Sequence, residues 1–156
     1  KSGGTQSNLL TAADLSFTSL STAVTTMSSL LDEAGLPVNQ KGSVLLVHPS
    51  NELNAIQLLK STSEPGSMNN DVNPLVKANS GANRMKLLVS PYITDSDSWF
   101  LFSDKEDHQF NLFWRSKPRR RNGVDERGTQ NLWWNIRQRF SVGYTHYFPV
   151  LGNAGA

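Results

Sequence analysis

Apolar and polar residues alternate over a long stretch near the C-terminal end of this chain. The polar or charged residues of odd number there are Asn135, Arg137, Arg139, Ser141 and Thr145. Successive side chains of a strand point to opposite faces, whereas a helix would scatter these residues around its circumference. The pattern predicts one long strand whose buried face is made by Leu132, Trp134, Ile136, Phe140, Val142, Tyr144 and Phe148.

A second alternating stretch, residues 110–115, precedes the first one. The connection between them carries Pro118, the pair Asn122 and Gly123, and Gly128, which are turn-forming residues. The two stretches are therefore expected to pair as an antiparallel hairpin with a long tip. Such a hairpin is larger than one small domain needs to close its own core, so we expect it to reach toward another subunit.

Positive charge is concentrated in and around the tip of this hairpin. Residues 115–139 hold eight Lys or Arg and two acids, a local balance of +6, so the formal charge of +2 leaves −4 for the rest of the chain. Partner preference is therefore expected to reside in this segment. The candidate subunit-interface residues are Arg115, Lys117, Arg119, Arg120, Arg121, Asp125, Glu126, Arg127, Trp133, Arg137 and Arg139.

Three interpretations of the basic segment are open. Contact with a neighbouring subunit is favoured, because Asp125 and Glu126 share the tip with the cations and because Trp133 and the arginines are residue types that dominate buried protein contacts. Direct nucleic-acid binding through residues 117–127 is the second interpretation, with Trp133 or Trp134 stacked on bases. A solvated loop without a partner is the third.

Two helices are expected in the first half of the chain. Ser16 is placed to cap the start of the first helix and Gly35 to follow its end. The second helix starts at Pro49, with an inner face predicted to comprise Leu53, Ile56 and Leu59. The apolar stripe of the first helix is Phe17, Leu20, Val24, Met27, Leu30 and Leu31.

Short apolar runs predict strands at residues 43–48, 85–89 and 99–102. Residues 61–83 lack periodicity and predict a long loop. Helices mixed with mainly antiparallel strands indicate an α+β fold.

No catalytic, cofactor or metal site is expected. The chain has no Cys, and its histidines at 48, 108 and 146 lack the spacing of metal ligands. Five acids within residues 95–107 are interpreted as solvated turns rather than a cation site, because no EF-hand spacing is present. No apolar run reaches the roughly 18 residues of a membrane helix, so a soluble protein is expected. Because no catalytic set of residues is found, the protein is also expected not to be an enzyme.

Several short motifs occur in an order that resembles a known family. They are LLDEAGLPVNQKGSVLLVHPSNELNAIQLLKS, NPLVK, KLLVSPYITDSDSWFLFSD and the terminal RQRFSVGYTHYFPVLG. Over residues 15–152 their order is similar to the C-terminal part of tailed-bacteriophage major capsid proteins of the Hong Kong 97 type. In that family a helix ending in D-x-x-G-x-P leads to an L-V-x-P strand end, an N-P-L turn follows, and a long hairpin closes the chain.

The resemblance implies a structural shell protein. Residues 15–105 would form an axial domain, a mixed sheet flanked by helices, and residues 106–152 a peripheral-domain hairpin, with a flexible lead-in at 1–14 and a tail at 153–156. The implied partners are copies of the chain itself in hexamers and pentamers, packaged double-stranded DNA indirectly, and portal, scaffold and decoration proteins. The implied location is the virion, assembled in the host cytoplasm, with no cofactor and no membrane. An encapsulin-type nanocompartment of the same fold stays open as an alternative.

The start of the chain differs from this family pattern. The N-terminal arm, extended loop and spine helix of the family are not found before residue 15, and the sequence begins with Lys1 rather than Met. A processed product and a longer chain represented in part are both open, and we expect an N-terminal portion to be missing.

Overall fold

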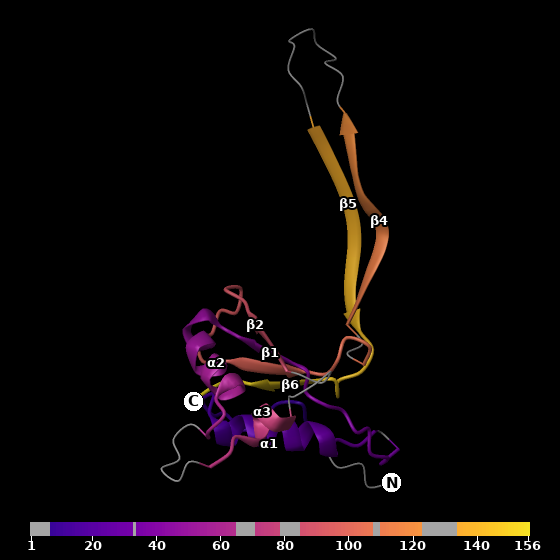
Figure 1. Ribbon diagram of the computed structural model, residues 1–156. Helices are drawn as coiled ribbons and strands as arrows, with labels where there is room; N and C mark the ends of the chain where they lie inside the picture. The colour runs from indigo at the N-terminus through magenta and orange to yellow at the C-terminus, as the bar shows by residue number, and fades with distance from the viewer. Residues whose placement is uncertain (1–6, 33, 65–70, 79–84, 108–109, 123–133) are drawn as a thin grey trace. The chain divides into compact units, whose positions relative to one another are not determined.

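The computed structural model describes residues 7–32, 34–64, 71–78, 85–107, 110–122 and 134–156. Contacts divide the chain into two units, Lys1–His108 with His146–Ala156, and Gln109–Thr145. The first unit contains the elements α1 (Phe17–Ser29), β1 (Val44–Val47), η1 (Pro49–Asn51), α2 (Glu52–Lys60), α3 (Pro74–Ala78), β2 (Lys86–Val89), β3 (Trp99–Phe102) and β6 (Val150–Asn153) (Figure 1). The second unit contains β4 (Phe110–Asn122) and β5 (Trp134–Tyr144).

The first unit is built around a mixed four-stranded sheet with the order β2-β1-β3-β6. β1 is parallel to β2 and antiparallel to β3, and β3 is antiparallel to β6. Parallel neighbours need a crossover connection, which here carries α2 and α3. The expected strands at 43–48, 85–89 and 99–102 are all present, and the predicted α+β class is confirmed.

The core of this unit is organised by rows of residues across the sheet. Leu45 pairs with Leu101, and Leu101 pairs with Leu151, and all three side chains are fully buried. Paired residues on adjacent strands project to the same face, so this row forms a continuous apolar surface. The buried residues of the two longer helices join the same cluster, namely Leu20, Ala23, Met27, Ala55, Leu58 and Leu59.

Helix α1 begins where the sequence predicts and ends earlier. The Ser16 side chain accepts from the Ser19 backbone N–H, and the Ser19 hydroxyl accepts from the Ser16 N–H, which makes a capping box. At the other end Leu30 is already extended, and a turn containing Gly35 at φ 80° brings Leu31 opposite Pro37. Leu30 is therefore a core residue outside the helix.

The predicted inner face of α2 is wrong at one position. Leu53 is 80% exposed, while Ala55, Leu58 and Leu59 are buried and Ile56 is half-buried. Residues at i, i+3 and i+4 share a helix face, and Leu53 stands two positions from Ala55, too far around the helix to join it.

Helix α3 lies in the stretch predicted as a loop. Its start is fixed by Asn73, which is fully buried and whose Oδ1 accepts from the Leu75 N–H at 3.0 Å. The Asn73 Nδ2 donates to the carbonyl oxygens of Leu58 and Ser61, at 2.9 and 3.0 Å. One side chain therefore caps α3 and ties it to the end of α2.

The C-terminal residues return to the first unit. The predicted strand through Phe148 ends at Tyr144, and the short strand β6, which the alternation does not predict, follows it. Residues 8–13 lie along β6: Leu10 N–H donates to the Gly152 carbonyl and Ala13 N–H to the Asn153 side chain. The outer edge of β6 is thus paired rather than open.

Candidate functional site

The predicted hairpin is present and forms a two-stranded sheet of its own. At its base Phe110 pairs with Tyr144, and toward its tip Asn122 pairs with Trp134. The connection was predicted to start after residue 115, and this is wrong, because residues 116–122 continue strand β4. Residues 123–133, with Asp125, Glu126, Arg127 and Trp133, lie outside the described part of the chain.

The ladder shifts register twice, between Trp114 and Ser116 and between Ser116 and Arg119. Each shift leaves one extra residue on β4, and the two together restore the original parity. Even-numbered residues of β4 therefore oppose even-numbered residues of β5 on both sides of the irregular part. Pro118, which has no N–H to donate, lies within it.

An aromatic face occupies the base of the hairpin. Trp114 and Phe140 are paired, with ring centroids 5.6 Å apart, and the rings of Phe110 and Tyr144 are 6.4 Å apart. Such tilted ring pairs stabilise cross-strand pairing. We define the aromatic face as Phe110, Leu112, Trp114, Phe140, Val142 and Tyr144.

The aromatic face is exposed in the single chain. The prediction that this parity is buried is therefore wrong for one copy: its side chains are between 42% and 72% exposed. Trp134 and Ile136 continue the same parity on β5 and are 52% and 67% exposed. Contiguous apolar surface of this kind marks an interaction site in soluble proteins.

Basic residues occupy the part of the hairpin nearer its tip. A groove of about 520 Å³ there is lined by six arginines with Ser116 and Asn135. Arg119 pairs directly with Arg137, so two like charges oppose each other across the ladder. We define the arginine groove by its cations, Arg115, Arg119, Arg120, Arg121, Arg137 and Arg139.

One arginine also contacts an aromatic ring. The Arg120 guanidinium carbon lies 3.6 Å from the centroid of the Trp134 ring, a cation–π contact. Arg120 therefore covers one face of that ring. The structure thus brings six of the predicted interface residues into one groove, while Lys117, also exposed, does not line it.

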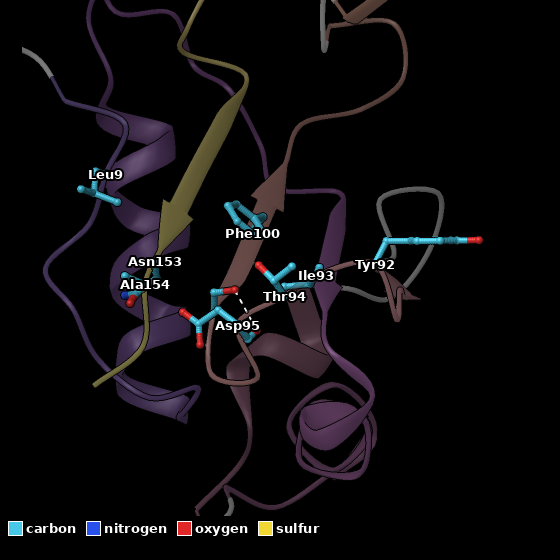
Figure 2. A pocket seen from close by; sticks show the side chains of 9 residues that line it. Leu9, Tyr92, Ile93, Thr94, Asp95, Phe100, Asn153 and Ala154 are labelled. Atoms are coloured by element: carbon cyan, nitrogen blue, oxygen red, sulfur yellow. Dashed lines mark hydrogen bonds between the residues drawn. The ribbon is translucent and has the colours of Figure 1, made fainter.

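A separate cavity lies in the first unit and was not predicted from the sequence. It has a volume of about 480 Å³, and the loop after β2 faces the end of β6 across it (Figure 2). Its lining is mainly apolar, and the Asp95 carboxylate accepts from the Asp97 N–H in its own loop. It is lined by Leu9, Tyr92, Ile93, Thr94, Asp95, Ser98, Phe100, Asn153 and Ala154.

Side chains that could bind a metal ion do not cluster in the described part of the chain. No group of three or more His, Asp or Glu that could hold a metal ion is found among these residues. Within the same residues no helix is long and apolar enough to cross a membrane. The exposed hairpin is thus the most distinctive functional feature.

Comparison with known families finds one match that covers most of the chain. The family is described as "Phage capsid protein", and the match covers residues 1–148, which includes the whole hairpin. No curated protein matches this sequence.

Proposed function

Because the chain belongs to the phage capsid protein family, we propose that it is the major subunit of an icosahedral shell that encloses double-stranded DNA. Proteins of this family are structural and not enzymes, and they act by association with copies of themselves. In the proposal, hexamers and pentamers of the chain close the shell. Portal, scaffold and decoration proteins are its further partners in the virion.

The observation that carries the proposal is the exposed aromatic face. Fully burying one such apolar side chain contributes about 1.5–3 kcal/mol. In a single copy these six side chains are about half exposed, so about half of this free energy is gained only when another surface covers them. Many identical contacts of this kind add up in a closed symmetric assembly.

The presence of two units supports an arrangement into axial and peripheral domains, as in the Hong Kong 97 type. In this proposal residues 15–105, with most of the mixed sheet and the helices, belong to the axial domain, and the hairpin within residues 106–152 belongs to the peripheral domain. Residues 146–152 return to the mixed sheet through β6. Residues 1–14 and 153–156 are the lead-in and the tail. The separate hairpin unit, Gln109–Thr145, supports the peripheral assignment.

The hairpin cations are proposed as part of the subunit interface. Exposed arginines with planar, bidentate donors are well suited to contacts between subunits. The proposed interface residues are Arg115, Lys117, Arg119, Arg120, Arg121, Asp125, Glu126, Arg127, Trp133, Arg137 and Arg139.

Electron microscopy of the purified full-length protein tests this proposal. We expect uniform icosahedral particles, with nuclease-protected double-stranded DNA in those taken from infected cells. A protein that stays monomeric at high concentration would contradict the shell assignment. Particles filled with protein cargo instead of DNA would reassign it to the nanocompartment alternative.

A further inference from the structure

Charge is sharply segregated along the hairpin. The base of the described hairpin, residues 110–114 with 140–144, contains no charged residue, whereas residues 115–122 with 134–139 contain seven Lys or Arg and no acid. The described residues of the hairpin therefore carry a net positive charge, all of it in the part nearer the tip.

The other unit carries the opposite sign. Residues 109–145 contain eight Lys or Arg and two acids, which gives +6, and the remaining residues contain seven Lys or Arg and eleven acids, which gives −4. A second copy of the chain thus offers a surface whose charge is complementary to the hairpin.

Repulsion between the cations of the arginine groove would be reduced by a bound anion. Like charges directly opposite in a ladder destabilise it, as Arg119 and Arg137 do here, and a carboxylate placed between them would reverse the sign of that contribution. Guanidinium groups bind carboxylates bidentately, so an array of arginines fits a cluster of Asp and Glu.

The densest exposed group of acids in the described residues of the first unit is the turn after β3. Asp104, Glu106 and Asp107 are all exposed within four residues, and the Asp107 N–H donates to the Asp104 carbonyl at 3.0 Å. Lys105, between Asp104 and Glu106, is exposed as well, and the loop before β3 holds only two exposed acids, Asp95 and Asp97.

We propose that the arginine groove of one copy binds the carboxylates of the Asp104, Glu106 and Asp107 turn of a second copy. This inference rests on the proposed shell function and names the partner of the hairpin within it. It accounts for both charged regions of the chain with one contact.

Nucleic acid is the rival occupant, and two observations disfavour it. Trp134, whose ring contacts the groove residue Arg120, is already covered on one face by it, which leaves the ring poorly placed to stack on bases. The positive charge of the hairpin is also largely matched by negative charge elsewhere in the same chain, whereas a polyanion-binding protein gains from an uncompensated basic surface.

The test uses two complementary variants of the full-length protein. The groove variant carries Arg119→Glu, Arg121→Glu, Arg137→Glu and Arg139→Glu, which turns the net charge of the six groove positions from +6 to −2, and the turn variant carries Asp104→Lys, Glu106→Lys and Asp107→Lys. Each variant alone is expected to lose particle formation, because its groove and turn have like charge. A mixture of the two is expected to form particles that neither variant forms alone, because a groove of one variant can then meet a turn of opposite sign on the other.

Controls and contrary outcomes keep the inference separate from the shell proposal. Lys41→Glu with Lys86→Glu reverses two exposed charges outside the groove and is expected to leave assembly unchanged, and circular dichroism checks that all variants fold. If wild type assembles and either variant does so alone, or if the mixture of folded variants fails, the pairing is wrong and the shell function stands. If the groove variant assembles but loses salt-dependent duplex DNA binding, nucleic acid is the occupant.

Discussion

Arg119 and Arg137 lie directly opposite each other in the β4–β5 ladder. Like charges in this position repel each other, and the repulsion destabilises the hairpin of a single chain. The cost is consistent with a surface whose favourable contacts form with another molecule rather than within the chain.

Replacing Arg137 with Glu should therefore stabilise the hairpin of the monomer and weaken assembly. An opposite-charge cross-strand pair contributes about 0.2–1 kcal/mol. We expect slower amide hydrogen exchange in β4 and β5 and a lower yield of particles. Gln138→Glu is the matched control, because it adds a negative charge on the same strand at the other parity; equal effects of both variants would contradict the assigned pairing.

Changing Leu112 and Val142 to Thr should abolish assembly while leaving the fold intact. The two residues are paired within the aromatic face and are 49% and 62% exposed, so the monomer loses little burial. Thr is β-branched, as Val142 is, and strands favour this shape. Sedimentation should show monomers, and thermal unfolding should give a melting temperature close to that of the wild-type protein. Particles at normal yield would show that the aromatic face stays uncovered in the shell.

Leu101→Ala should destabilise the first unit by about 2–5 kcal/mol, since it empties the middle of the row that runs from Leu45 to Leu151. Chemical denaturation of an assembly-deficient variant measures this change. Leu88→Ala, at a position 54% exposed on β2, is the control and should cost far less. A loss at Leu88 as large as that at Leu101 would contradict the placement of the core.

Asn73→Ala should cost about as much as a core truncation despite the polar character of the residue. The change removes the cap of α3 and leaves the carbonyls of Leu58 and Ser61 without this donor; each buried group left unsatisfied costs about 1–3 kcal/mol. Denaturation in the same background is the measurement, with Asn54→Ala, an exposed amide bonded to the Leu15 carbonyl, as the comparison. We expect the smaller loss at Asn54.

The sequence predicts strands and capping better than it predicts burial. A period of two over residues 134–144 is sufficient to place β5, because alternation follows from strand geometry alone. It cannot identify what covers the apolar side, and in one copy that side is exposed. The error at Leu53 has the same cause: an apolar residue type does not by itself show that the side chain is covered, and Leu53 is 80% exposed.

The elements that were missed have weak local patterns. Strand β6 has four residues, one of them Gly152, and is defined by its pairing with β3, which sequence periodicity does not report. Helix α3 has five residues, and its available signal was the pair Asn73 and Pro74, a capping residue followed by the residue most favoured at a first helical position. The arginine groove depends on register shifts that no pattern in the sequence indicated.

The two shifts on β4 also make one edge of the hairpin irregular. Regular strands with free edges recruit further strands indefinitely, and Pro118 together with the extra residues makes the outer edge of β4 a poor template for such growth. Strand β5, in contrast, has a regular eleven-residue edge. An irregular edge on one side disfavours extension of this two-stranded sheet into a continuous cross-β stack, and we expect contacts between copies to use side-chain surfaces instead.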